Sequence, residues 1–231
     1  MRCLKVNEWI SNFEENERDL KKKLVSIYGS EKLIGNRKKV YLETLKKFKN
    51  SFGLAGGTAV ALQIGHRRSI DFDLFSHKFF KNISLERNIR MATKVDKMLV
   101  NREGEITFFT KKVKTTFFCY PFVIDYVEHL DTVIKMPSLL TLAAMKAYAL
   151  GKRAKWKDYV DLYFIIKQYH SIAEIAEQGK NIFGHEFNSK IFRSQLSYFD
   201  DVNYVEAIEF MPGFAVSEKK IKKALMEFSL S

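Results

Sequence analysis

The sequence predicts an α+β protein, with a mixed αβ front half and an all-helical back half that meet near residue 135. Two observations lead to this expectation. Residues 105–109, 112–119 and 122–127 are rich in aromatic and β-branched residues, which is typical of strands. From Pro137 onward, apolar residues recur at helical spacing over residues 138–149 and 156–169 instead. We therefore expect an αβ domain over residues 1–135, including N-terminal helices, and a helical domain over residues 136–231.

The remaining elements follow from local patterns. We expect helices over residues 6–28, 36–49 and 85–100, and further short helices over residues 171–230. Breaks in this last stretch are expected at Gly179, at Gly184 and at Pro212-Gly213.

A strand, a turn and a second strand form the centre of the front half. The apolar run 52–55 precedes Gly56-Gly57-Thr58, and Thr58 is a candidate cap for a helix that ends near Gly65. Residues 69–75 then alternate between apolar and polar side chains, which predicts a strand with two distinct faces.

Composition limits the class of protein. The chain has 231 residues and a formal net charge of +12, which suits either a polyanionic partner such as nucleic acid or a lysine-rich solvated surface. No apolar run approaches the ~18 residues of a membrane span. The first residues carry spaced charges rather than an apolar signal core, so we expect a cytoplasmic protein without a membrane partner.

Three carboxylates form a candidate metal site. Asp71 and Asp73 are two residues apart on the predicted strand, so both point to the same face. Asp125 is the lone acid within the apolar run 122–127, where an unpaired carboxylate would be costly to bury. Ligation by oxygen alone favours Mg2+ or Mn2+ over zinc. The alternative is a solvated polar face of an edge strand, which leaves Asp125 unexplained.

The Gly56-Gly57-Thr58 turn is a candidate phosphate cradle. Glycines allow close backbone approach, and the N-terminus of the following helix offers free N–H groups and the positive end of its dipole. Gly-Gly before a helix is by itself more often only a tight turn. Beside a carboxylate metal site, however, it suits phosphoryl or nucleotidyl transfer.

These motifs resemble a known family. Gly56-Gly57-Thr58-Ala59, the run from His66 to Phe75, and the later block with Lys146, Arg153 and residues 157–163 are similar to toxin nucleotidyltransferases of the AbiEii/AbiGii type, within the DNA polymerase β-like superfamily. The similarity runs from about residue 54 to about residue 167. It implies a small mixed β-sheet that carries the metal-binding acids and is flanked by helices. An all-helical C-terminal half follows this core.

The resemblance also implies functional roles. Asp71 and Asp73 would hold metal ions, and Asp125 would be the third acid on the general plan of the superfamily. The groups that would line the triphosphate are Gly56, Gly57, Thr58 and Ser69. Lys146 would neutralise phosphate charge, and Asp158 or Asp161 would support the site from the helical half.

Several of these residues have simpler explanations. Lys146 lies among apolar residues, so it either extends its amine to solvent or meets an anion. Asp161 could form only an i, i+4 ion pair with Lys157. His66 and Arg67 precede the predicted strand and could contact phosphate or RNA, although a histidine in a turn is usually only solvated.

The function expected from these features is transfer of a nucleoside monophosphate from an NTP to an acceptor, with release of pyrophosphate. The basic surface favours RNA as the acceptor, with tRNA as one candidate, and the resemblance suggests a toxin with a cognate antitoxin. Two alternatives stay open: a catalytically inactive nucleic-acid-binding relative, and an enzyme that modifies a protein.

Overall fold

The computed structural model describes residues 42–231, and these form an α+β fold around a five-stranded mixed sheet, which confirms the predicted fold class. The strand order is β1-β2-β5-β4-β3. Strands β2 and β5 are parallel, and the other neighbours are antiparallel. The bounds are β1 Gly53–Ala55, β2 Phe72–Ser76, β3 Lys97–Arg102, β4 Glu105–Thr110 and β5 Val113–Cys119.

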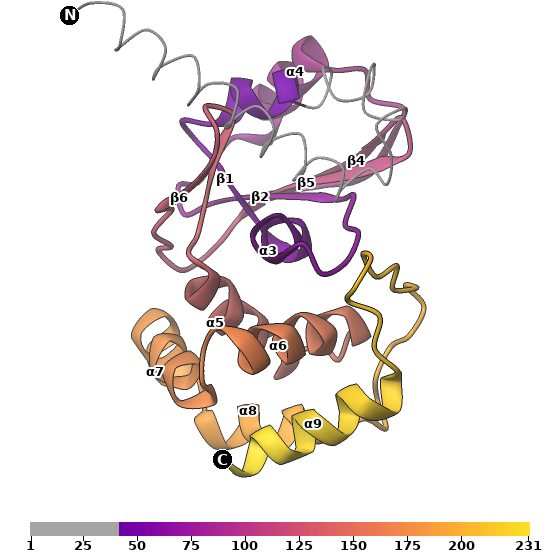
Figure 1. Cartoon of the computed structure of the whole chain (residues 1–231). Helices are drawn as coiled ribbons and strands as arrows, with labels where there is room; N and C mark the ends of the chain where they lie inside the picture. Colours follow the sequence, from indigo (N-terminus) through magenta and orange to yellow (C-terminus); the bar gives the residue numbers. More distant parts are fainter. Residues whose placement is uncertain (1–41) are drawn as a thin grey trace, which may run out of the picture.

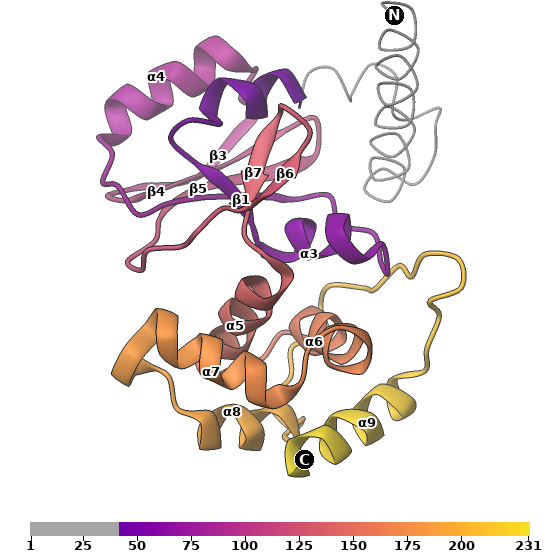
Figure 2. The same cartoon turned by 60° about the vertical axis from the view of Figure 1, so that its left-hand side comes forward.

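Helices cover both faces of this sheet (Figure 2). On one face lie α4 (Asn82–Ala92) and the helical residues 42–48. On the other face lie α3 (Gly56–Ile64) and, beyond it, the helical back half. The alternation in β2 matches this arrangement, because Phe72 and Leu74 are buried in the core whereas Asp73 and Phe75 are half-buried. The polar face of β2 therefore looks toward the back half.

The back half is helical, as expected. Its elements are α5 (Leu139–Leu150), α6 (Trp156–Gln168), α7 (Ile172–Phe183), a 3-10 turn (Gly184–Glu186), α8 (Ser189–Leu196) and α9 (Glu218–Leu230). Ser138 caps α5 and Ser171 forms a capping box with Glu174 at the start of α7, so these helices begin where local chemistry satisfies their free N–H groups.

A long connection returns from the back half to the front half. Residues 197–217, between α8 and α9, extend to the link between α3 and β2 (Figure 1). There the amide of Arg68 donates to the carbonyl of Glu209 at 2.8 Å, and the amide of Met211 donates to the carbonyl of His66 at 3.1 Å. These bonds hold the residues that precede β2 against the helical half.

Two predicted elements are wrong in the front half. The helix expected over residues 85–100 ends at Ala92, and Lys97–Arg102 forms the edge strand β3. Pairing with β4 supplies backbone hydrogen bonds that local periodicity cannot reveal. The strand expected over residues 122–127 is a loop, and the hairpin β6 (Glu128–Leu130) and β7 (Ile134–Met136) follows it.

In the loop at residues 122–127, individual apolar side chains pack into the protein and hold the loop in place. Ile124 is buried, and the Tyr126 hydroxyl donates to the carbonyl of Phe75 at 3.1 Å. A Cβ atom at Gly53 would lie 2.0 Å from the Tyr126 ring, so the ring rests directly on the β1 backbone. Val123 and Val127 are exposed.

Two other expectations are corrected or left aside. Gly179 does not break a helix, since α7 continues through it. The helix predicted over residues 6–28 lies outside the described residues, as do residues 36–41 of the helix predicted over 36–49, whereas residues 42–48 are helical as expected.

Among residues 42–231, no helix is both long and apolar enough to cross a membrane.

Candidate functional site

A cavity of about 480 Å³ lies between the polar face of the sheet and the helices α5 and α6. This volume is within the range of small-molecule sites. The predicted site residues that line it are Gly56, Gly57, Thr58, Arg67, Ser69, Asp71, Asp73, Lys146 and Asp158. Residues from the two halves of the sequence thus meet in one cavity.

The glycine turn begins α3, as predicted, and each glycine is required for a different contact. Gly56 has φ +69°, and a Cβ atom there would lie 2.3 Å from Oδ2 of Asp73. A Cβ atom at Gly57 would lie 2.6 Å from Nη2 of Arg67. The missing side chains therefore let the helix N-terminus approach both a carboxylate and a guanidinium.

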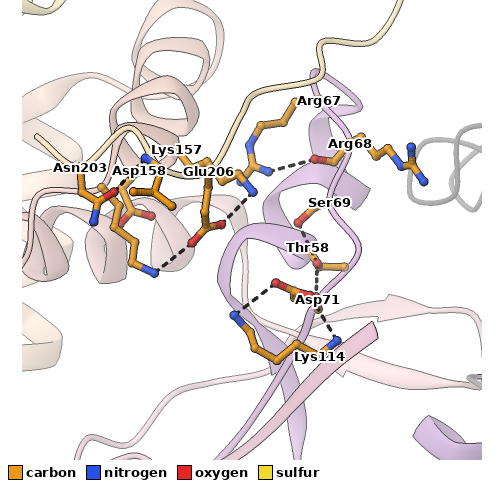
Figure 3. Close-up of polar contacts among 12 residues, drawn as sticks. Thr58, Arg67, Arg68, Ser69, Asp71, Lys114, Lys157, Asp158, Asn203 and Glu206 are labelled. Carbon is orange, nitrogen blue, oxygen red and sulfur yellow. Dashed lines mark hydrogen bonds and ion pairs between the residues drawn. The ribbon is translucent and has the colours of Figure 1, made fainter. Parts of the chain in front are cut away.

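Thr58 does not cap α3, contrary to expectation. The N-cap is Ala55, and no side chain within residues 42–231 bonds to the free amides at this end of the helix. The Thr58 hydroxyl instead lies 2.9 Å from Oγ of Ser69 and donates to the backbone carbonyl of Asp71 (Figure 3). Thr58 and Ser69 therefore hold the backbone at Asp71, and the Thr58 hydroxyl does not satisfy the first amides of α3.

Asp71 and Asp73 both line the cavity, Asp71 from just before β2 and Asp73 from within it. The ammonium of Lys114 lies 3.3 Å from Oδ2 of Asp71, and its amide donates to Oδ1 of Asp71 at 3.3 Å (Figure 3). Lys114 comes from β5, the parallel neighbour of β2. It was not predicted, because its position beside Asp71 depends on strand pairing.

Burial raises the pKa of the Asp73 carboxyl above its ordinary value, and the nearby Asp71 charge adds to this increase. Lys114 opposes it. Burial alone would lower the pKa of Lys114, but the charge and hydrogen bond of Asp71, together with the charges of Asp73 and Glu206, raise it above its ordinary value. Lys114 is thus the positive charge that acts most strongly on both Asp71 and Asp73.

Asp161 is the centre of a buried ion-pair cluster. Its Oδ1 lies 2.6 Å from Nε of Arg67 and 2.7 Å from Nε2 of His66, and its Oδ2 lies 2.7 Å from Nζ of Lys146. Although burial alone would raise it, Arg67 and Lys146 hold the pKa of Asp161 well below its usual value. The cluster joins the residues before β2 to α5 and α6.

This cluster corrects the expectation that His66 is only a solvated turn residue. Both His66 and Arg67 are buried, with exposed fractions of 0% and 1%, although Arg67 also lines the cavity. Arg67 uses Nε and Nη2 on Asp161, and Nη1 donates to the carbonyl of Arg68. Its guanidinium lies against Gly57, so Arg67 packs directly on the glycine turn. Asp161 pairs with these groups rather than with Lys157, which bonds to Glu206.

Lys146 and Asp158 lie at the boundary between this cluster and the cavity. Lys146 donates to Oδ1 of Asp158 at 2.6 Å, and the attraction of Asp158 and Asp161 outweighs burial and raises its pKa. Oδ2 of Asp158 is buried without a hydrogen-bond partner among the described residues, although Nε of Arg153 lies 3.8 Å away. In this structure the ammonium of Lys146 therefore meets two protein carboxylates instead of extending to solvent.

Asp125 is not part of the site. It lies exposed in the loop that replaces the predicted strand, and it does not line the cavity. Among the described residues, no group of three or more His, Cys, Asp or Glu side chains is arranged to hold a metal ion. The fold therefore does not bring Asp125 to the cavity that Asp71 and Asp73 line.

The rim of the cavity on the helical side is strongly basic. It includes Lys152, Arg153, Lys155 and Lys157. Glu206, from the connection between α8 and α9, bonds to Lys157 at 2.8 Å and to Lys155 at 3.2 Å (Figure 3). Hydrogen bonds from these lysines lower the pKa of Glu206 to about 2. No local pattern around residue 206 could have placed this acid at the cavity.

Comparisons with known proteins agree with this geometry. The family model "Nucleotidyl transferase AbiEii toxin, Type IV TA system" matches residues 115–210. The uncharacterized protein aq_aa25 of Aquifex aeolicus is 30% identical over 184 residues, which cover 78% of this chain and 88% of that protein.

Two solved structures share the fold. JHP933 of Helicobacter pylori has a TM-score of 0.53 and 17% identity, covering 87% of this chain and 91% of its own. The nucleotidyltransferase toxin MenT4 of Mycobacterium tuberculosis has a TM-score of 0.55 and 10% identity, covering 93% and 88%. The two solved structures show that the fold is shared, whereas the family match and the long sequence relative show that the chain belongs to the AbiEii family of toxin nucleotidyltransferases.

Proposed function

We propose that this enzyme binds an NTP with a divalent cation in the cavity and transfers its nucleoside monophosphate to a hydroxyl of an RNA acceptor, with tRNA as one candidate. The observation that carries the proposal is the meeting of a glycine-opened helix N-terminus, two carboxylates and a buried lysine in one cavity. A cavity built only to hold a polyanion would not need two carboxylates beside its phosphate cradle.

The site fits Mg2+ or Mn2+ held jointly with the substrate. Magnesium commonly uses one or two protein carboxylates, with phosphate oxygens and water completing its shell. Asp71 and Asp73 would supply the protein oxygens, and Gly56 leaves the space that the Asp73 carboxylate occupies. When bound there, such an ion neutralises phosphate charge and lowers the pKa of the acceptor hydroxyl.

The protein groups position the reacting atoms. The amides at Gly56, Gly57 and Thr58 would bind the outer phosphates, which develop negative charge as pyrophosphate leaves. Lys114 and Lys146 would add positive charge on either side of them. The Asp161 cluster would keep Arg67 and Lys146 in place, so that little reorganisation accompanies the reaction.

The partners follow from the same proposal. The basic rim would hold the RNA backbone, and the toxin family suggests a cognate antitoxin protein. An enzyme that consumes NTPs would act in the cytoplasm. We also propose that the division near residue 135 separates the part that carries the acids from the part that carries Lys146 and Asp158.

The test is a transfer assay with magnesium, each α-labelled NTP in turn, and total cellular RNA. Label on RNA is expected with the wild-type protein. Asp71→Asn and Asp73→Asn should each lower it by about 100-fold or more, because each removes a charge that acts on the reacting phosphates. Asp125→Asn is the matched control, since it makes the same chemical change outside the cavity and should leave transfer unchanged.

The alternatives give different results in this assay. Label on protein instead of RNA would favour a protein acceptor. If no NTP yields a labelled product, and RNA binds equally well to the wild type and to Asp71→Asn, the protein is a nucleic-acid-binding relative and the proposal is wrong.

A further inference from the structure

The sheet face in the cavity changes from acidic to aromatic along its two central strands. In the parallel pair β2 and β5, Asp73 lies opposite Thr116 and Phe75 lies opposite Phe118. Residues two apart on a strand share a face and are separated by about 7 Å. On β2, the aromatic side chain of Phe75 therefore lies next to the carboxylate of Asp73 on the same face of the sheet.

Three rings form this aromatic end. Phe75, Phe118 and Tyr120 all line the cavity and are half-buried, so each keeps part of its surface open. The Phe75 and Tyr120 rings stack with centroids 5.1 Å apart and planes inclined by 23°, and the centroids of Phe75 and Phe118 are 5.5 Å apart. From α5, Leu142 and Met145 line the same cavity. The aromatic end is thus an apolar compartment next to a charged one.

Tyr120 differs from the other tyrosines nearby. Its hydroxyl makes no hydrogen bond within residues 42–231, whereas the Tyr126 hydroxyl donates to the carbonyl of Phe75 and the Tyr148 hydroxyl donates to Glu186. Burial raises the pKa of Tyr120, so its hydroxyl keeps its proton and can both donate and accept. A half-buried hydroxyl without a partner, in a ligand cavity, is a candidate contact for the ligand.

Tyr148 cannot serve in the same way. One face of its ring stacks on Phe183, with centroids 4.1 Å apart and planes inclined by 11°. The ammonium of Lys152 lies 4.3 Å from the same ring centroid. Its ring and its hydroxyl are therefore already used by the protein.

We propose that Phe75, Phe118 and Tyr120 form the subsite for the nucleobase of the NTP, with the Tyr120 hydroxyl bonding to a polar atom on the edge of the base. This inference rests on the proposed function and adds the specificity-determining residues. The triphosphate lies at the glycine turn and the acids, and the base extends along the strands to the aromatic end. Stacking on aromatic rings accepts any base, so the single hydroxyl supplies the preference among bases.

The test compares the binding of each magnesium NTP with that of magnesium tripolyphosphate, which has the phosphates but no base, by calorimetry. The wild type should bind at least one NTP about tenfold or more tighter than tripolyphosphate. Phe118→Leu, which keeps an apolar side chain but removes the ring, should lose about 5-fold or more of NTP affinity. Tyr120→Phe should lose about 2- to 10-fold and bring the affinities of the four NTPs closer together.

Neither variant should change the affinity for tripolyphosphate, which separates a base contact from general damage to the site. Tyr169→Phe is the matched control, because Tyr169 is exposed at the end of α6 and does not line the cavity. Thermal melts of all variants confirm that they fold.

Each other outcome decides against the inference. If NTPs bind no tighter than tripolyphosphate, or if both variants bind NTPs like the wild type, the base does not lie at the aromatic end. If the variants instead weaken only RNA binding, the rings contact the acceptor. If neither NTP nor tripolyphosphate binds the wild type, the proposed function fails together with the inference.

Discussion

At the scale of single residues, the geometry of the site depends on glycine at position 56, where any side chain would collide with Asp73. Gly56 has a positive φ and leaves its Cβ position to the Asp73 carboxylate. We predict that Gly56→Ala lowers NTP binding and transfer by at least about tenfold, because the added methyl group moves the carboxylate or the helix N-terminus. Calorimetric titration with magnesium NTP measures the effect on binding.

Gly65 is the matched control for this change. It has φ +74° at the other end of α3, and a Cβ atom there would meet nothing within 4 Å. Gly65→Ala has a similar backbone cost of about 1 kcal/mol, but it should leave NTP binding intact. Equal losses of binding in the two variants would mean that backbone strain, and not the space for Asp73, explains the result.

The Asp161 cluster is a residue-scale determinant of stability. Asp161→Asn keeps the shape of the side chain but leaves Arg67 and Lys146 buried with much of their charge uncompensated. We predict a loss of about 3–5 kcal/mol in the free energy of unfolding, measured by urea denaturation. Glu218→Gln, which breaks only the exposed pair with Lys222, should cost less than about 1 kcal/mol. If the two variants lose similar amounts of unfolding free energy, the Asp161 cluster contributes no more to stability than an exposed ion pair.

The same carboxylate predicts a pH dependence with a definite sign. Arg67 and Lys146 hold the pKa of Asp161 below its value in the unfolded chain, so its stabilising contribution is complete above about pH 4 and is lost as the pH falls further. The difference in unfolding free energy between the wild type and Asp161→Asn should therefore be constant from about pH 5 to 8 and shrink at lower pH. A difference that shrinks above pH 5 would contradict this assignment.

At the scale of elements, α7 contains Gly179, and replacing it with alanine should destabilise the protein although alanine has the higher helix propensity. Alanine normally stabilises a helix interior by about 1 kcal/mol relative to glycine. At Gly179, however, a Cβ atom would lie 2.7 Å from the Phe187 ring. We predict that Gly179→Ala destabilises the protein by about 1–3 kcal/mol in thermal or urea unfolding.

A second variant tests this cause. Combining Gly179→Ala with Phe187→Leu removes the ring that the methyl group meets, so the double variant should recover part of the stability relative to the sum of the two single changes. Strict additivity would show that the Phe187 ring is not responsible.

The elements also show what the sequence could predict and what it could not. The alternation before and within β2, the glycine turn and the helices α5 and α6 are local patterns, and each was placed within a few residues. The strand predicted over residues 122–127 failed because its apolar residues anchor a loop, with Tyr126 resting on Gly53. Strand β3 was missed because its edge position is decided by pairing with β4.

The candidate site divides in the same way. Asp71 and Asp73 could be found because their spacing alone gives them a common face. Lys114 could be found only with knowledge that β5 runs parallel to β2, and Glu206 only with the path of residues 197–217. The buried roles of His66 and Arg67 were missed because their partner Asp161 is more than 90 positions away along the chain.

At the scale of the whole molecule, the net charge of +12 becomes useful once the basic rim is located. Lys152 and Arg153 are exposed beside the cavity, with side-chain exposed fractions of 60% and 59%. We predict that Lys152→Gln with Arg153→Gln lowers the slope of log affinity for RNA against log salt by about 2. The same double change at Lys219 and Lys220 on α9, away from the cavity, keeps the net charge matched and should change the slope less.

The cavity also couples the two halves of the chain, since Gly56 and Asp73 line it from the front half and Lys146 and Asp158 from the back half. A ligand that binds only this assembled site stabilises the whole fold, by about 2.7 kcal/mol at 100 times its dissociation constant. For a protein of this size, that corresponds to an increase in melting temperature of about 5–10 °C with magnesium NTP. Asp73→Asn should abolish the increase, and Asp125→Asn should retain it. An increase that persists in Asp73→Asn, or that is equally large with EDTA in place of magnesium, would place the nucleotide elsewhere on the protein.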